Sequence, residues 1–272
     1  MLKDLRISVI GPGAMGESII GGLLRQELVA PEQIWTSDPN ESRLRDVQAH
    51  HGVHTSQDNL ATAQWGQIVI FAVKPQQLQR VLQPLRGKLR VDALVISIVA
   101  GATISTFAAA LEHSAVVRSM PNTPAMIGEG MTVWTAAPEV SESQRGWART
   151  VLSALGRELF VDNEQYLDMS TALNGTGPAY FFLMMEAMID AGVHMGLARR
   201  VAEDLVLQTM LGSVRYALQS GLHPAQLRNA VTSPGGTTSA ALSELERGGM
   251  RTVLADAIWA AYRRSVELGK QG

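Results

Sequence analysis

The feature that most constrains the fold is a glycine cluster, Gly11, Gly13 and Gly16, directly after a short β-rich run over residues 5–10. The first glycine permits a tight turn after a strand, the second lets a phosphate approach the backbone, and the third lets a helix pack against the sheet. Apolar residues then recur at helical spacing over 18–28. This context predicts a dinucleotide-binding βα unit with a cofactor loop of Gly11, Pro12, Gly13, Ala14, Met15 and Gly16.

The composition narrows the class of protein. The 272 residues are 46% hydrophobic and 18% charged, with a formal net charge of -2. No long run of one charge sign occurs, so we expect no nucleic acid as a partner. The sequence has no cysteine, which excludes disulfides, thiolate catalysis and cysteine-ligated metals, and we expect no metal site.

The sequence shows no targeting or membrane segment. Acidic and basic residues precede the first apolar run, which does not fit a signal peptide. The uncharged stretch over 93–111 contains serine, threonine and glycine, so we expect a strand, a turn and a helix there instead of a membrane span. We therefore expect a cytoplasmic, soluble enzyme without a membrane partner.

Strands and helices alternate as far as residue 162, which is typical of a doubly wound sheet. Strands are expected at residues 5–10, 33–37, 67–73, 94–99, 115–118, 131–135 and 158–161. From residue 164 onward the pattern is helical, with apolar stripes and no strand. The expected fold is an α/β, Rossmann-type NAD(P)-binding domain over residues 1–163, followed by an all-helical substrate-binding and dimerisation domain over 164–272.

Phenylalanine and methionine are dense around residues 181–188. This indicates more apolar surface than a domain of about 110 residues hides by itself. Two interpretations remain open. The segment either forms a buried homodimer interface or is one helix central to its own small domain.

The second strand is expected to end beside the adenosine ribose of the dinucleotide. Asp38 lies there, about 20 residues after Gly16. A carboxylate accepts from the ribose hydroxyls of NAD and repels a 2′-phosphate, but Asp38 before Pro39 is also typical of a turn. Ser37 and Arg43 are close in sequence, and Arg43 can pair with a phosphate. The choice between NADP and NAD stays open.

Two later strand ends are expected to contact the cofactor. The buried strand over 67–73 leads into Ala72-Val73-Lys74-Pro75, beside the crevice where a dinucleotide binds. Lys74 either reaches a phosphate or the substrate, or is an ordinary exposed loop lysine. The next strand ends in Val99-Ala100-Gly101, small residues that let the nicotinamide ribose approach.

A polar turn in the C-terminal third is the second chemical signal. The segment Thr232-Ser233-Pro234-Gly235-Gly236-Thr237-Thr238 places a Gly-Gly pair after a proline, flanked by hydroxyls. Such a pair makes a tight turn with exposed backbone N–H groups, which suits a small carboxylate and one further polar atom. With the cofactor loop, this turn predicts a redox enzyme for a small-molecule substrate.

These residues resemble the pyrroline-5-carboxylate reductase family. The matching motifs follow in order over nearly the whole chain: Ile10 to Gly16, Ala72 to Pro75, Arg118 to Pro124, Gly175 to Tyr180, His223-Pro224 with Gln226-Leu227, and Ser233 to Thr238. The resemblance implies reduction of 1-pyrroline-5-carboxylate to L-proline, the last step of proline biosynthesis, with NADPH or NADH. It also implies a homodimer, or a higher oligomer built from dimers.

The resemblance further assigns roles to residues. Backbone N–H groups near Ser233, Gly235, Gly236 and Thr237 would bind the substrate carboxylate. Thr238, the expected catalytic residue, would hydrogen-bond the ring nitrogen, and Asn59 would contact the adenosine side of the cofactor. The chain departs from the family pattern at Asn174, where a serine is usual, and at residues 221–222, where some members carry an acid.

Two other functions compete with this interpretation. A β-hydroxyacid-type dehydrogenase needs a catalytic lysine after the Rossmann domain, and no lysine lies between Lys88 and Lys270. A non-catalytic dinucleotide sensor has no need of a carboxylate-binding turn. No histidine is required as a base: His194 is expected in a core and His223 in a turn. Feedback inhibition by proline and alternative cyclic-imine substrates stay open.

Overall fold

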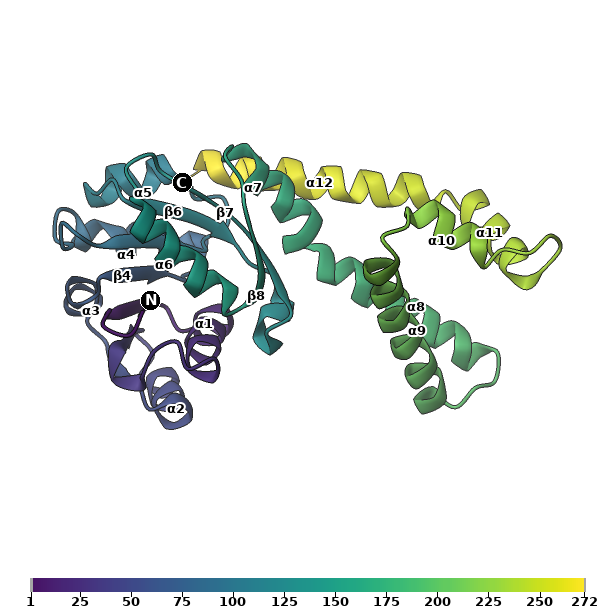
Figure 1. The fold of residues 1–272 in the computed structure, drawn as a ribbon, viewed down its shortest axis with the longest axis horizontal. Coiled ribbons are helices and arrows are strands. Elements are labelled where there is room, and N and C mark those ends of the chain that lie inside the picture. Colours follow the sequence, from purple (N-terminus) through teal and green to yellow (C-terminus); the bar gives the residue numbers. More distant parts are fainter. Residues whose placement is uncertain (1, 272) are drawn as a thin grey trace. The chain divides into compact units, whose positions relative to one another are not determined.

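The computed structural model describes residues 2–271 and divides into two compact units (Figure 1). The first comprises the described parts of Met1–Thr176 and Ala260–Gly272, and the second comprises Gly177–Trp259. Two segments that the sequence analysis assigned to the second domain, α7 (Gln165–Ser170) and the last part of α12 (Met250–Gln271), therefore group with the first unit. The domain boundary at residue 163 stays a prediction.

An eight-stranded sheet lies at the centre of the first unit, in the order β3-β2-β1-β4-β5-β6-β7-β8. All neighbouring strands are parallel except the antiparallel pair β6 and β7. The strands are β1 (Ile7–Ile10), β2 (Ile34–Ser37), β3 (His54–Ser56), β4 (Ile68–Phe71), β5 (Leu94–Ser97), β6 (Val116–Met120), β7 (Gly130–Ala136) and β8 (Gly156–Phe160). Every expected strand is present. Only β3 was not expected, because three residues are too few to show a period.

Helices cover both faces of this sheet. They are α1 (Ala14–Arg25), α2 (Glu41–His51), α3 (Asn59–Trp65), α4 (Leu78–Leu82), α5 (Ile104–Leu111) and α6 (Glu142–Ser153). Helix α2 begins where the Asn40 side chain accepts from the N–H groups of Ser42 and Arg43, and it ends at Gly52, which has φ of 68°. Local capping therefore fixes the length of the helix that follows β2.

Side chains alternate between the two faces along each strand. Ile68 and Ile70 of β4 pack in one buried cluster with α1, α2 and α6, whereas Val69 and Phe71 pack in another with α3, α4 and α5. Because helices cover both faces of the sheet at β4, neither face of this strand needs polar side chains. This explains its continuous apolar sequence.

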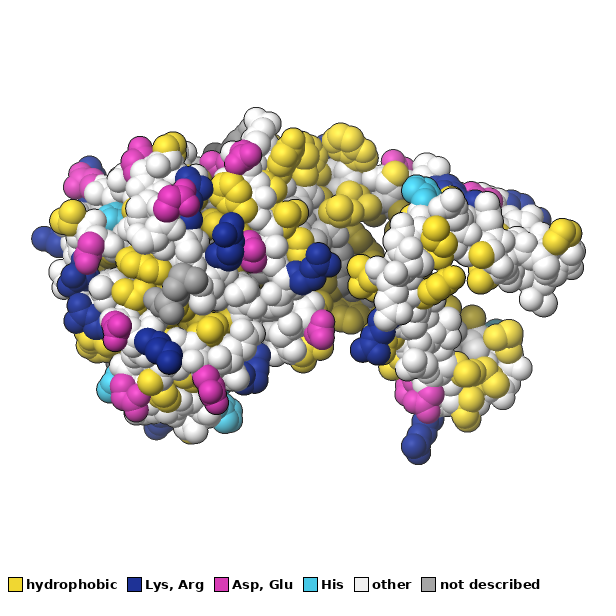
Figure 2. Space-filling view, in the orientation of Figure 1, with side chains coloured by type: hydrophobic (Ala, Val, Ile, Leu, Met, Phe, Trp, Pro, Cys, Tyr) yellow, Lys and Arg dark blue, Asp and Glu magenta, His cyan; other side chains and the backbone are white. Residues whose placement is uncertain are grey.

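The second unit is helical throughout. It contains α8 (Gly177–His194), α9 (Arg199–Ser220), α10 (Pro224–Ala230), α11 (Thr237–Arg247) and the first part of α12. Within residues 177–259, the buried hydrophobic side chains are Ala202 and Val206. Large apolar side chains are exposed along the helices, as the yellow groups in Figure 2 show; they include Phe181, Phe182, Leu183, Leu211, Val214 and Leu218. Helix α8 is therefore not the centre of a packed domain of its own.

The environment of His194 corrects one expectation from the sequence. His194 was expected in a core but is exposed, because it ends α8 just before the turn at Gly196. His223 does lie at a turn, where it caps the start of α10. No helix within residues 2–271 combines the length and the apolar composition needed to cross a membrane.

A buried arginine holds two connecting helices to the sheet of the first unit. Arg118 on β6 is 4% exposed and donates to Glu164 (Nη1 to Oε1, 3.1 Å) and to Asp168 of α7 (Nη2 to Oδ1, 2.8 Å). The Ser265 hydroxyl of α12 donates to the same oxygen of Asp168 at 3.0 Å. The segments that precede and follow the second unit in sequence are therefore both anchored through one guanidinium.

Arg118→Ala removes the partner of two partly buried carboxylates. We expect the free energy of unfolding to fall by about 3–5 kcal/mol, measured by urea denaturation. Arg86→Ala is the matched control, since its ion pair with Glu112 is exposed and is worth less than about 1 kcal/mol. Equal losses in the two variants would contradict the anchoring role of Arg118.

Candidate active site

The cofactor loop has the geometry that its glycines predict. Gly11 has φ of +90°, and an ideal Cβ there would lie 2.8 Å from Cγ1 of Val73. A Cβ on Gly16 would lie 2.4 Å from the carbonyl oxygen of Gly11, so α1 approaches the strand more closely than any side chain allows. A Cβ on Gly13, by contrast, would meet no atom within 4 Å. The loop is therefore closed toward the protein and open at Gly13.

A pocket of about 410 Å³ lies at the carboxyl ends of β1, β2 and β4. It is lined by Ile10, Gly11, Gly13, Ser37, Asp38, Pro39, Gln57, Asn59, Ala72, Val73, Lys74, Gln77, Arg80 and Val81. The structure thus brings together eight of the expected cofactor residues from four separate segments. Gln57, Gln77 and Arg80 also line the pocket but were not predicted from the sequence. The available signal was the basic side chain of Arg80, which lies shortly after the strand end at Lys74.

The polar groups of this pocket, together with the start of α1 that follows Gly13 at its edge, fit a dinucleotide. Helix α1 starts directly after Gly13, so the N–H groups of Ala14, Met15 and Gly16 have no partner within the helix. These N–H groups, at the positive end of the helix dipole, suit a pyrophosphate. At the other side of the pocket, the Ser37 hydroxyl donates to Oδ1 of Asn59 at 2.7 Å. This pair fixes polar groups at the end of β2, where an adenosine ribose binds in such folds.

Several expected cofactor residues lie outside the lining of this pocket. Arg43 donates from Nε to the carbonyl oxygen of Pro12 at 2.6 Å and pairs with Glu17. Pro75 begins a 3₁₀ turn, η2 (Pro75–Gln77). Gly101, with φ of +77°, lies against α12, where its Cβ would be 3.0 Å from the backbone nitrogen of Gly269. The cofactor roles of Arg43, Pro75 and Val99-Ala100-Gly101 stay predictions.

The Gly-Gly turn of the second unit forms the N-terminus of α11. The N–H of Gly236 donates to the carbonyl oxygen of Ser233 at 3.1 Å, and Gly235 has φ of +69°. Gly236 then caps α11 without a side-chain acceptor, which leaves the first N–H groups of the helix unpaired. The turn therefore presents backbone donors at the positive end of a three-turn helix, an arrangement that suits a carboxylate.

The hydroxyls of this segment divide into two groups. Thr232 donates to the carbonyl oxygen of Arg228 at 2.7 Å and so serves α10. The hydroxyl groups of Ser233, Thr237 and Thr238 form no hydrogen bond with any residue in the described range 2–271. Thr238 is half-buried, whereas Ser233 and Thr237 are exposed. The hydroxyls expected to contact the substrate are therefore the ones that the fold leaves available.

The two departures from the family pattern have structural roles. Asn174 lies in a π-helical turn, η5 (Thr171–Gly175), where its Nδ2 donates to the carbonyl oxygen of Met131 at 2.9 Å. Its own carbonyl oxygen accepts from Nδ2 of Asn122 at 3.2 Å. Asn174 thus ties the end of the first unit to β7. Gly221, at the position where some members carry an acid, ends α9 with φ of 63°.

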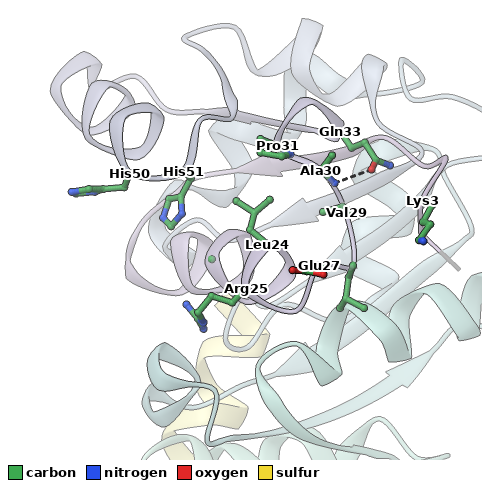
Figure 3. Close-up of a pocket in the computed structure, with 12 residues that line it drawn as sticks. Lys3, Leu24, Arg25, Glu27, Val29, Ala30, Pro31, Gln33, His50 and His51 are labelled. Atoms are coloured by element: carbon green, nitrogen blue, oxygen red, sulfur yellow. Dashed lines mark hydrogen bonds between the residues drawn. The ribbon is translucent and has the colours of Figure 1, made fainter.

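Another cavity of the first unit lies elsewhere, between the ends of α1 and α2 (Figure 3). It measures about 920 Å³ and contains none of the expected site residues. Figure 3 shows His50, His51 and Arg25 along one side and Lys3 at the other. Among the described residues, no group of three or more His, Cys, Asp or Glu side chains is arranged to hold a metal ion.

The fold and the two loops together define a class of protein. A Rossmann-type sheet with an open glycine loop, followed by a helical unit whose Gly-Gly turn presents unpaired backbone N–H groups, is typical of a dinucleotide-dependent oxidoreductase. Two family models match the chain: "NADP oxidoreductase coenzyme F420-dependent" over residues 6–101 and "Pyrroline-5-carboxylate reductase dimerisation" over residues 164–268.

Similar proteins name the family. Pyrroline-5-carboxylate reductase of Synechocystis is 41% identical over 98% of this chain and 100% of its own length. Among solved structures, the Coxiella burnetii enzyme is 37% identical with a TM-score of 0.88, covering 97% of this chain and 98% of its own. The Plasmodium falciparum enzyme, solved with NADP bound, is 29% identical with a TM-score of 0.90, covering 98% and 99%. The chain belongs to the pyrroline-5-carboxylate reductase family.

The open side of the glycine loop can be tested by adding one methyl group. Gly13 has ordinary extended backbone angles, and its Cβ would meet no atom, so Gly13→Ala leaves folding intact. The methyl projects where the pyrophosphate is expected, and we predict that the Kd of a nicotinamide dinucleotide rises at least about tenfold, measured by fluorescence titration.

Gly16→Ala is the matched control for this variant. Its Cβ meets a backbone oxygen that cannot move aside, so it is expected to lower stability by about 2 kcal/mol or more. A Gly13→Ala protein that binds the dinucleotide as tightly as the parent would show that the pyrophosphate lies elsewhere.

Proposed function

We propose that this chain reduces 1-pyrroline-5-carboxylate to L-proline, the last step of proline biosynthesis, with NADPH as hydride donor and NADH as the alternative. Family membership over nearly the full chain supports the reaction. The NADP bound to the Plasmodium falciparum relative supports the donor. The observation that carries the proposal is the turn before α11, whose unpaired N–H groups and free hydroxyls match a carboxylate beside a ring nitrogen.

The turn would bind the substrate through its carboxylate. The Gly236 N–H already donates to the Ser233 carbonyl oxygen, so the N–H groups of Gly235 and Thr237 and the helix dipole of α11 are what favours a negative charge at this point. The Ser233 hydroxyl adds a donor, since it lies directly over Gly236, whose ideal Cβ would be 2.4 Å from its Oγ. Glycine at 236 is therefore required for the turn to keep Ser233 in this position.

Thr238 would hold the ring nitrogen. When bound, the dinucleotide supplies a hydride to the carbon of the C=N bond, and the nitrogen becomes an amine. The Thr238 hydroxyl can accept from a protonated imine N–H or donate to the amine product. It thus orients the ring and needs no histidine partner, because the C=N carbon is already electrophilic. Positioning of this kind accounts for a large share of rate enhancement.

Neither of the two competing functions fits the residues of this chain. A β-hydroxyacid-type dehydrogenase requires a lysine base in the region between Lys88 and Lys270, which has none. A dinucleotide sensor would not explain the free donors before α11. The residue roles named above, and a cytoplasmic location, stay predictions.

We also propose that the enzyme is a homodimer, or a larger assembly built from dimers. The family model over residues 164–268 describes dimerisation, which supports a homo-oligomer. The exposed Phe181, Phe182 and Leu183 of α8 and Leu218 of α9 agree with this, since apolar surface of this extent is normally covered. A second copy of the chain is the partner with the matching apolar helices.

The reaction is tested with purified protein, 1-pyrroline-5-carboxylate, and NADPH or NADH side by side. We expect oxidation of the dinucleotide, and absence of turnover with both donors would refute the proposed function. Thr238→Val keeps the shape of the side chain but removes the hydroxyl, so kcat is expected to fall about 100-fold with dinucleotide affinity unchanged. Thr252→Val, an exposed change on α12, is the control that keeps full activity.

The oligomer is tested by placing a charge on the apolar face of α8. Leu183, 66% exposed, is expected to be buried in the dimer, so Leu183→Glu should shift the protein to monomers in analytical ultracentrifugation. Val91, 99% exposed on the first unit, provides the control variant Val91→Glu, which should stay oligomeric. A parent protein that sediments as a monomer would contradict the dimer.

A further inference from the structure

Glu17, in the first turn of α1, is the point where three basic side chains of α2 meet. Arg43 forms an ion pair with Glu17, and Nε2 of His51 lies 3.1 Å from its Oε1. His50, beside His51 at the end of α2 in Figure 3, lies 3.8 Å from the same oxygen. Burial raises the pKa of Glu17, but hydrogen bonds from Arg43 and His51 outweigh it and hold the pKa below its usual value. Glu17 is therefore ionised at neutral pH.

Two of the three guanidinium nitrogens of Arg43 are engaged in this arrangement. Its Nε donates to the carbonyl oxygen of Pro12 in the glycine loop at 2.6 Å, while its Nη2 pairs with Glu17. Arg43 lines a separate hollow with Glu17 and His51, and it does not line the dinucleotide pocket. Its positive charge is thus neutralised by a carboxylate and held toward the loop.

The position of Arg43 makes this engagement relevant to the cofactor. NADP differs from NAD by a phosphate on the 2′-oxygen of the adenosine ribose, and an arginine near the end of the second strand commonly pairs with it. Arg43 lies in the first turn of α2, directly after the strand end at Ser37 and Asp38. Asp38 does line the pocket, and its carboxylate repels a phosphate. The preference for NADP or NAD therefore depends on the repulsion of the 2′-phosphate by Asp38 and on its attraction by Arg43.

We propose that Glu17 is a specificity-determining residue that limits the preference for NADP(H) by neutralising and withholding Arg43. This inference rests on the proposed function only in taking the pocket as the dinucleotide site. Replacing Glu17 by its uncharged isostere leaves Arg43 with a net positive charge beside the loop. That charge attracts the 2′-phosphate of NADP and has no counterpart to attract in NAD.

The test measures the Kd of NADP⁺ and of NAD⁺ by fluorescence titration of the full-length protein, which requires no turnover. In Glu17→Gln, the ratio of the NAD⁺ Kd to the NADP⁺ Kd is expected to rise about 5- to 10-fold. Glu17→Ala should shift the ratio in the same direction and serves if the glutamine variant folds poorly. Glu17→Gln combined with Arg43→Gln should abolish the rise, because the charge that causes it is gone.

Glu27→Gln is the matched control, since Glu27 is exposed, follows the same helix and forms no ion pair with any residue from 2 to 271. In Glu27→Gln, the ratio of the NAD⁺ Kd to the NADP⁺ Kd should stay within about twofold of the parent's ratio. An unchanged or lower ratio in Glu17→Gln, or a rise that persists in the double variant, would overturn the inference. A parent that binds neither dinucleotide would overturn it together with the proposed function. A parent that binds both without reducing 1-pyrroline-5-carboxylate would overturn the proposed function alone.

Discussion

The fold and the candidate site both depend on one close backbone contact, where Gly16 of α1 lies against Gly11 at the end of β1. Because a Cβ on Gly16 would be 2.4 Å from the Gly11 oxygen, only glycine lets the helix start so near the strand. The contact directs the unpaired N–H groups of α1 over the carboxyl ends of the strands. It also brings Glu17 opposite Arg43 of α2. The expected cofactor loop and the proposed determinant of cofactor choice thus lie at the same turn.

The second unit follows a different physical rule. The sheet of the first unit buries two apolar faces, whereas residues 177–259 leave Phe182, Leu183 and Leu218 exposed. Such helices gain their stability by covering these side chains with another surface. The same unit carries the turn before α11. The proposed substrate binding and assembly therefore belong to one stretch of chain, while the expected cofactor loop belongs to the other.

Local rules predicted most of the fold and part of the site. The strand-loop-helix context of Gly11 to Gly16 and the apolar run of β4 were sufficient, because both patterns arise from neighbours in sequence. Three features could not be predicted. Strand β3 is too short for a period, His194 is exposed in spite of an apolar helix, and Arg43 pairs with Glu17 of another helix. The exposure of His194 follows from its place at the end of α8, and the Arg43–Glu17 pair joins two separate helices, which a pattern within one helix does not contain.

The central claim is a hydride transfer to the C=N bond of 1-pyrroline-5-carboxylate, and isotope labelling tests it most directly. The enzyme is supplied with NADPH deuterated at the transferable position of the nicotinamide ring, and the proline formed is examined by NMR. The account predicts deuterium on the ring carbon of the former C=N bond and nowhere else. Unlabelled proline, or deuterium at another carbon, would contradict it.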